Sequence, residues 1–174
     1  MLEGKNVNLR VVEKEDLPFL KEWKNSIEFI GEYQSVQQRT VRDLEKQYVE
    51  LTEEQWFFIE KKEGTKIGII SYRPVFTTQE ISYALLPSAR GKGYCSEAVK
   101  IMVDYLFLSK DIVRVQAHID ARNMASQRVL EKAGFKKEGT FRKEYFVRGE
   151  WRDSCTFSFL REEWKEPKVL TKTA

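Results

Sequence analysis

The hydrophobic and polar positions of the first 25 residues predict a strand followed by a helix. Residues 6–12, NVNLRVV, alternate between polar and apolar side chains, as a half-buried strand does. Residues 15–25 place Leu17, Leu20 and Trp23 on one face, at the spacing of an amphipathic helix, with a proline near its start. The chain is therefore expected to begin with a strand and to pack a helix against it.

The next stretch changes its pattern twice. Residues 26–39 have no clean period, and they predict a loop with some helix. Thr40 then opens the segment TVRD, which resembles a capping box. Leu44, Tyr48 and Leu51 continue a helical stripe from there.

The rest of the chain alternates strands and helices. The pattern predicts a hairpin at 56–74, a strand at 80–87, a long helix ending near residue 109, a strand at 112–120, a short helix at 123–135 and a closing hairpin at 140–160. The strand–helix–strand unit over 80–120 is expected to be a right-handed crossover with parallel strands. This mixed order predicts an α/β (α+β) fold with a largely antiparallel sheet.

Length and composition limit the organisation and the class of the protein. The chain has 174 residues, which predicts a single domain over 1–165 and a flexible tail over 166–174. Hydrophobic residues make up 41% and charged residues 33%, the profile of a soluble globular protein, and no apolar run is long enough to cross a membrane. Cys95 and Cys155 are too few for a disulfide framework or a metal cluster. We therefore expect a cytoplasmic protein without a metal, and the net charge of +3 does not favour nucleic acid.

The segment ARGKGYCSEAV is the first with chemistry in its pattern. Gly91 and Gly93 leave the backbone bare at the start of a helix, where unpaired N–H groups bind anions. Arg90 and Lys92 add positive charge, so the pattern predicts a phosphate or pyrophosphate site, with a tight turn and solvated basic residues as the alternative. A P-loop is excluded because Lys92 is followed by neither Ser nor Thr, and a Rossmann fingerprint because the third glycine is missing.

A second motif, N-x-x-S-x-x-V-L-x-x-x-G-F, follows at 123–135. Together with LLPSARGKGYCSEAV at 85–99, it resembles the GNAT family of N-acetyltransferases, in particular the branch of the ribosomal-protein N-terminal and spermidine acetyltransferases. The resemblance extends over nearly the whole chain, from the opening strand and helix to the closing hairpin. It implies a central, mostly antiparallel sheet flanked by helices, in which the fourth and fifth strands splay apart.

The resemblance also implies an activity. Acetyl-CoA would be the donor and a primary amine the acceptor, which attacks directly in a ternary complex without a covalent enzyme intermediate. The acceptor is expected to be a protein N-terminus, with a polyamine or an antibiotic as the alternative. From a different class, the chain would be a catalytically silent CoA-binding sensor or interaction module. The branch also brings a homodimer into consideration, and neither nucleic acid nor a membrane is an expected partner.

The resemblance assigns residues to the donor. Backbone N–H groups from Arg90 to Cys95 would hold the pyrophosphate, although Ser88 departs from the family's Gln or Arg at that position. The pantetheine arm would pair with the splayed strand at 83–86, and Asn123 would hydrogen-bond to it or simply cap its helix. The expected cofactor-binding residues are Tyr83, Ala84, Leu85, Leu86, Arg90, Gly91, Lys92, Gly93, Tyr94, Cys95, Asn123 and Ser126.

Three expected catalytic groups follow from the same resemblance. Glu80 would take the proton of the amine if burial or a relaying water made it a stronger base, or it would be a solvated charge at a strand end. The backbone N–H near Leu85 would stabilise the oxyanion. Leu130 replaces a tyrosine of many relatives, so the Ser126 hydroxyl is expected to stabilise the leaving thiolate, or else to cap its helix, with Tyr145 in reserve.

Two reactive residue types receive ordinary assignments. His118 is the one histidine in the sequence and alternates with apolar neighbours, so we expect a packing or edge residue rather than a base. Cys95 is not expected to act as a nucleophile, because transfer in the family is direct. The acceptor is expected to meet the loop after the first helix, at Glu28, Phe29, Glu32 and Tyr33.

Overall fold

The computed structural model describes residues 1–50 and 54–167. It contains an eight-stranded sheet in the order β1-β2-β3-β4-β5-β6-β8-β7, in which β5 and β6 are parallel and the other neighbours antiparallel. The strands are β1 (Leu2–Glu3), β2 (Val7–Val11), β3 (Gln55–Lys61), β4 (Lys66–Val75), β5 (Thr78–Leu85), β6 (Arg114–Asp120), β7 (Lys136–Val147) and β8 (Glu150–Leu160). The helices are α1 (Leu17–Asn25), α2 (Ile27–Ile30), α3 (Val41–Glu50), α4 (Tyr94–Ser109) and α5 (Met124–Ala133).

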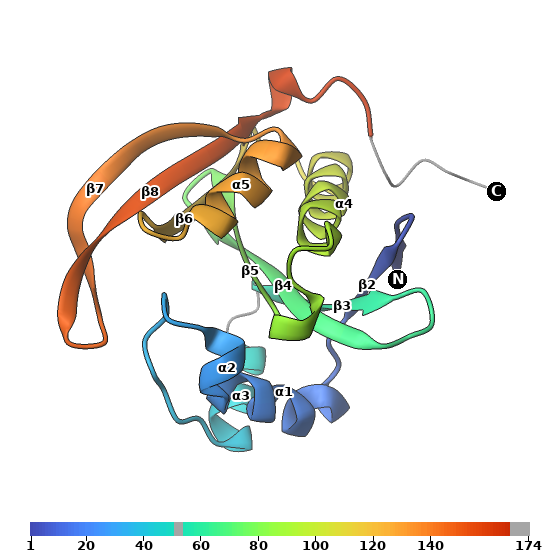
Figure 1. Ribbon diagram of the computed structural model, residues 1–174. Coiled ribbons are helices and arrows are strands. Elements are labelled where there is room, and N and C mark those ends of the chain that lie inside the picture. The colour runs from blue at the N-terminus through green and yellow to red at the C-terminus, as the bar shows by residue number, and fades with distance from the viewer. Residues whose placement is uncertain (51–53, 168–174) are drawn as a thin grey trace.

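Helices cover both faces of the sheet. Figure 1 shows α1, α2 and α3 gathered on one side, and α4 and α5 on the other. Successive side chains of β3 point to opposite faces of the sheet, so this strand contributes to the core on both sides. Phe57 and Ile59 pack into the large core beneath α4, whereas Trp56 and Phe58 pack against the helices of the other face. The continuous apolar run of this strand is therefore explained by burial on both faces.

The helices α1 and α3 begin where the sequence predicts. Pro18 lies in the first turn of α1. The Thr40 N–H donates to Asp43 Oδ2 at 2.8 Å, and the Asp43 N–H donates back to Thr40 Oγ1 at 3.1 Å, which is a reciprocal cap at the start of α3. Leu44 of this helix is fully buried. Leu51, the last residue of the predicted stripe, lies outside the described residues.

β5 and β6 splay apart, as the family resemblance implies for the fourth and fifth strands. The two-residue β1 is not among the strands that the sequence predicts, so the numbers differ by one. The pairing of β5 with β6 consists of two registered pairs, Gln79 with Val115 and Glu80 with Gln116. The remainder of β5, from Ile81 to Leu85, bonds to β4 on one side and has no partner strand on the other within the described chain. This open edge provides a row of unpaired backbone groups next to α4.

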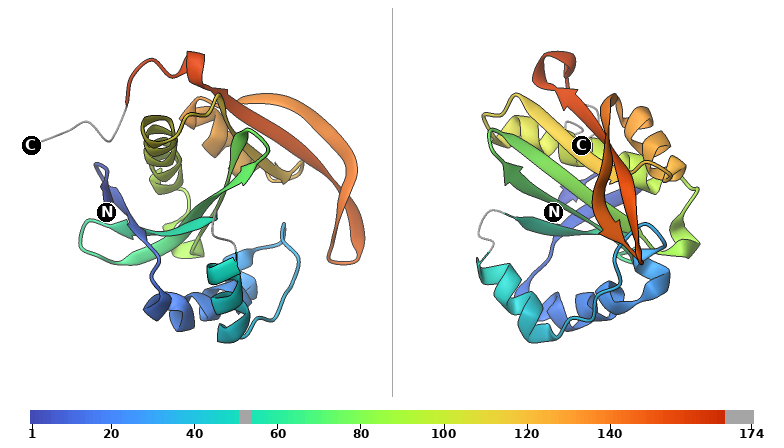
Figure 2. Two further views of the ribbon diagram at one scale, coloured as in Figure 1. Left: turned by 180° about the vertical axis from the view of Figure 1, so that it is seen from behind. Right: turned by 90° about the vertical axis from the view of Figure 1, so that its left-hand side faces the viewer.

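The β7–β8 hairpin reaches back to the segment that follows α2. Its turn has positive φ at Arg148 and Gly149, 51° and 86°, as a two-residue hairpin turn requires. Arg148 Nη2 donates to the Gly31 carbonyl at 2.6 Å, and Arg152 Nη1 donates to the Glu32 carbonyl at 2.9 Å. Figure 2 shows the hairpin curving past the sheet toward that segment.

The C-terminal tail is described only in part. The predicted tail begins at residue 166, and its residues from 168 onward lie outside the described part. Among the described residues, the helices are too short or too polar to span a bilayer.

Candidate active site

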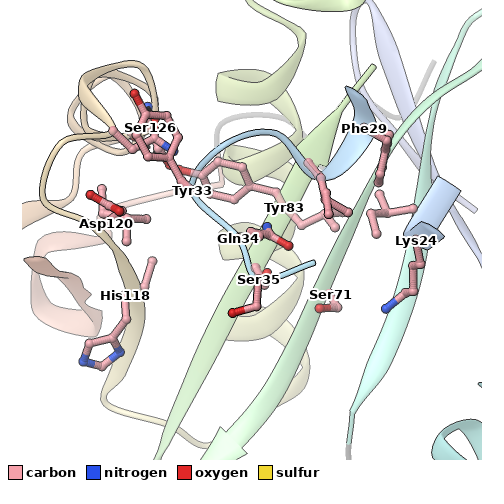
Figure 3. Close-up of a pocket in the computed structure, with 18 of the residues that line it drawn as sticks. Lys24, Phe29, Tyr33, Gln34, Ser35, Ser71, Tyr83, His118, Asp120 and Ser126 are labelled. Carbon is pink, nitrogen blue, oxygen red and sulfur yellow. Dashed lines mark hydrogen bonds between the residues drawn. The ribbon is translucent and has the colours of Figure 1, made fainter. Parts of the chain in front are cut away.

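A cleft of about 530 Å³ opens between the splayed strands, the segment after α1 and the closing hairpin. Figure 3 shows lining side chains from the segment after α1, from β4 and β5, and from β6 and α5. Of the residues assigned from the sequence, seven line the cleft: Phe29, Tyr33, Tyr83, Ala84, Asn123, Ser126 and the reserve donor Tyr145. The fold thus places part of the expected acceptor site and part of the expected donor site in one space.

The other expected residues lie around the cleft rather than on its wall. Glu28 and Glu32 contribute carbonyl oxygens to Arg90 and Arg152, and their carboxylates do not line the cleft. Leu85 and Leu86 end the open strand, and the glycine loop follows just beyond them. These donor assignments therefore lie outside the lining of the cleft, between the end of β5 and the start of α4.

The glycine loop has the geometry of an anion site. Gly91 and Gly93 have φ of 76° and 83°, and a Cβ at either position would meet nothing within 4 Å. The space that the side chains leave is therefore open, and the backbone conformation itself favours glycine. The first backbone bond of α4 runs from the Glu97 N–H to the Gly93 carbonyl at 3.1 Å, so the N–H groups just before it remain available for a phosphate. This arrangement fits the pyrophosphate of a coenzyme A.

Arg90 differs from its expected role at the phosphate. Its N–H donates to the Pro87 carbonyl at 3.2 Å, and its guanidinium donates to the carbonyls of Leu85 at 3.1 Å and Glu28 at 3.2 Å. The guanidinium also reaches the Phe29 carbonyl at 3.4 Å. Because these bonds occupy both the N–H and the side chain, Arg90 fastens α2 to the end of β5. The positive charge nearest the open loop is then that of Lys92.

The Leu85 N–H faces the open edge of β5. The next residue, Leu86, donates its N–H to the Ile67 carbonyl at 2.9 Å, toward β4. Successive residues of a strand direct their backbone groups to opposite edges, so the Leu85 N–H points to the β6 side. No strand pairs with β5 there within the described chain. This orientation supports the expected role of that N–H as an oxyanion donor, which stays a prediction.

Ser126 and Tyr83 join their hydroxyls at the wall of the cleft. The two oxygens are 2.7 Å apart, and Tyr83 Oη also lies 3.2 Å from the Ser126 carbonyl, to which it can only donate. Burial raises the pKa of Tyr83, so its phenol stays protonated. Asn123 caps α5 by accepting from the Ser126 N–H at 3.0 Å, so the Ser126 hydroxyl is not needed as the helix cap. Burial raises the pKa of the Cys95 thiol to about 12, which agrees with its being no nucleophile.

Glu80 is engaged by two side chains and does not line the cleft. Its Oε1 accepts from Arg73 Nη2 at 2.6 Å, and its Oε2 lies 2.7 Å from His118 Nδ1. Burial opposes the carboxylate charge, but the hydrogen bonds and charges of Arg73 and His118 outweigh it and lower the pKa of Glu80. His118, for which the sequence predicts a packing or edge residue rather than a base, lines the cleft.

Four further charged side chains line the cleft, and sequence reasoning did not select them. Lys24 and Arg39 are basic, and Glu54 and Asp120 are acidic. The Asp120 carboxylate is 1% exposed and pairs with Arg152 at 3.2 Å. No local signal marks these residues, because each becomes part of a site only when distant segments meet. Lys24 reaches the cleft because α1 packs over β3, and Asp120 reaches it because β6 pairs with β8 of the hairpin.

Comparisons with known proteins identify the family. Residues 6–136 match the family profile described as "Acetyltransferase (GNAT) domain". The chain belongs to the GNAT acetyltransferases. The probable N-acetyltransferase YjcK of Bacillus subtilis is 32% identical to it, over 94% of this chain and 98% of that protein. The spermidine N(1)-acetyltransferase of Escherichia coli is 24% identical, over 94% of this chain and 91% of that protein.

Solved structures have the same fold. The spermidine N-acetyltransferase of Vibrio cholerae, in complex with CoA and spermine, superposes with a TM-score of 0.81 at 20% identity, over 92% of this chain and 99% of that one. The ribosomal-protein-S5-alanine acetyltransferase of Vibrio fischeri gives 0.78 at 25% identity, over 94% and 98%. This GNAT protein is accordingly an N-acetyltransferase that uses acetyl-CoA and a primary amine, and the expected family and fold class are confirmed.

Proposed function

We propose that this GNAT enzyme acetylates the α-amine of a peptide or protein N-terminus. The observation that supports this acceptor is the charge of the cleft. Lys24 and Arg39 line it without an ion pair in the described chain. Glu54 offsets one of these two charges, and the Asp120 carboxylate is buried against Arg152, so the cleft keeps a net positive charge. A polyamine carries several positive charges and would meet uncompensated positive charge here, at a cost in affinity.

The chemistry of the amine favours the same acceptor. An α-amine has a pKa near 8, whereas a lysine-like amine has one near 10.4, so at pH 7 roughly a tenth of the α-amine is already neutral. A peptide also carries backbone groups that can pair with the walls of the cleft. The enzyme therefore needs only a modest base to remove the remaining proton.

We assign the proton to His118. With a carboxylate at Nδ1, the imidazole keeps its proton on that nitrogen and leaves the Nε2 lone pair for the amine. Glu80 is then a positioning residue, which holds the ring and offsets the charge that His118 gains. This assignment keeps Glu80 in the reaction, although the sequence-based hypothesis gave it the proton directly.

The remaining groups act on the donor. The thioester of acetyl-CoA supplies an electrophilic carbonyl carbon and a thiolate leaving group. The Leu85 N–H would donate to the carbonyl oxygen as negative charge develops there. The Ser126 hydroxyl, with Tyr83 Oη beside it, would donate to the departing sulfur.

A panel of amines tests the acceptor. Purified enzyme with acetyl-CoA is given peptide amides with free N-termini, spermidine or an aminoglycoside, and the release of free thiol is followed. Thiol release with the peptides at a kcat/KM at least tenfold above that with spermidine supports the proposal. Preference for spermidine would overturn it in favour of a polyamine enzyme, as the 24% identical Escherichia coli relative is named. Binding of acetyl-CoA without turnover of any amine would indicate the silent CoA binder.

A further inference from the structure

Lys24 is a cation that lines the proposed acceptor cleft. It lies on α1, is half-buried, and makes no ion pair with any side chain in the described ranges 1–50 and 54–167. Its ammonium lies 4.3 Å from the centroid of the Trp56 ring, which stabilises the cation only in part. Burial lowers its pKa to about 8, although the charge of Glu54 opposes this. A charged group held at such a cost suggests that something else completes the pair.

Arg39 adds a second cation to the same corner. Its guanidinium is held by the side-chain oxygens of Gln37 and Gln47, which are neutral. The Trp56 indole N–H also has no hydrogen-bond acceptor within the described chain. Glu54 also lines the cleft near this corner. Its one negative charge does not balance the two positive charges of Lys24 and Arg39.

We propose that the corner formed by Lys24, Arg39 and Trp56, called here the cationic corner, binds a carboxylate carried by the acceptor peptide. The inference rests on the proposed function and narrows its substrate class. The amine enters at one end of the cleft, beside His118 and Ser126, while an acidic side chain of the same peptide pairs with Lys24 at the other end. Figure 3 shows Lys24 on the opposite side of the cleft from Ser126 and His118.

Strand register gives the length of this acceptor. Trp56 on β3 pairs with Ser71 on β4, and Ser71 pairs with Ser82 on β5. Two strand spacings of about 4.8 Å separate β3 from β5, and the open gap beside β5 adds a few ångströms. An extended peptide advances about 3.3 Å per residue. The carboxylate is therefore expected on the third or fourth residue of the peptide, and a free amino acid is too short to occupy both ends.

Matched peptides test this directly. The tetrapeptide amides Ser-Ala-Glu-Ala and Ser-Ala-Ala-Glu are compared with the same peptides carrying glutamine in place of glutamate. We expect at least one glutamate peptide to have a KM about tenfold lower than its glutamine partner, with similar kcat, because one charge-assisted contact is lost. In Lys24→Met the two KM values should become equal, and Lys24→Arg should keep most of the difference.

A lysine outside the cleft provides the control. Lys21 lies on the same helix and pairs with Glu22 at 2.8 Å, away from the cleft lining. Lys21→Met should leave the ratio of the two KM values as in the wild type. Equal KM values for glutamate and glutamine peptides in the wild-type enzyme would overturn the inference while leaving peptide acetylation intact. Turnover of spermidine but of no peptide would instead overturn the proposed function, so the two failures are distinguishable.

Discussion

Single residues decide the chemistry of the acceptor end. His118 and Glu80 form a pair across the two splayed strands, at 2.7 Å, and His118 alone of the two lines the cleft. Lys24 lies at the other end, where burial holds its pKa at about 8. Each of these placements has a consequence that a single substitution reveals.

His118→Gln is expected to lower kcat by about 100-fold, the usual effect of losing a general base. Glu80→Gln should cost less, since it removes only the carboxylate that positions the ring and leaves the imidazole in place. Thiol release at saturating acetyl-CoA compares the two variants. A Glu80→Gln variant that loses more activity than His118→Gln would return the proton to Glu80.

Lys24→Met is expected to stabilise the protein at pH 7. The folded state lowers the pKa of Lys24 from 10.5 to about 8, so the buried charge costs stability below pH 8, of the order of 1 to 3 kcal/mol. Between pH 8 and 10.5 the unfolded chain binds a proton that the folded chain has lost, and wild-type stability rises with pH. The advantage of the variant should therefore shrink toward pH 10.5. Urea unfolding at pH 7 and pH 10 measures it, and a variant less stable than wild type at pH 7 would contradict this reading.

At the scale of elements, the start of α4 is the expected binding site of the donor's pyrophosphate. The positive φ values of Gly91 and Gly93 and the open space at both Cβ positions leave the first N–H groups of the helix accessible. Elsewhere, the β3–β4 turn contains Gly64, which has φ of 85° and equally open surroundings. Gly91 and Gly64 thus have similar backbone strain, but only Gly91 lies at the expected pyrophosphate site.

Gly91→Val is expected to weaken acetyl-CoA binding at least tenfold, because a branched side chain would fill the space that the phosphate needs. Gly64→Val supplies the control, because it introduces similar backbone strain in a turn away from the expected pyrophosphate site. It should leave the dissociation constant unchanged. Calorimetric titration with acetyl-CoA compares the variants after their melting temperatures show that both are folded. Equal affinity in Gly91→Val and wild type would refute the assignment of the loop.

For the whole molecule, one buried ion pair contributes to the closure of the cleft. Arg152 on β8 pairs with Asp120 on β6 at 3.2 Å, with 10% and 1% of the two side chains exposed. It also donates to the Glu32 carbonyl in the segment after α2. A single side chain thus ties the hairpin, the sheet and the acceptor segment together.

Arg152→Met is expected to lower the free energy of unfolding by about 3 kcal/mol, because it leaves a buried carboxylate without its main partner. Adding Asp120→Asn should restore part of that loss, which denaturant titration of the two variants can establish. The single variant should also raise the KM for the acceptor more than that for acetyl-CoA. Equal stability of wild type and Arg152→Met would show that Arg122, which lies 3.4 Å from Asp120, suffices as a partner.

The sequence by itself determined the elements, the strand order around the crossover, the glycine loop and the family. These depend on local patterns: the alternation of a strand, the cap at Thr40 and the positive φ that Gly91 and Gly93 permit. Such signals arise from neighbours a few residues apart, so they can be interpreted before the chain is folded.

Only the tertiary structure decided which of these residues form the site. Glu80 and His118 are 38 positions apart, and Arg90 reaches a carbonyl 62 positions away on α2. The corner around Lys24 exists because α1 packs its helix over Trp56 of β3. Contacts of this kind depend on strand register and on the docking of separate segments. Patterns along the chain do not encode either of these. They therefore indicated the glycine loop and did not indicate the positions of His118 and Lys24.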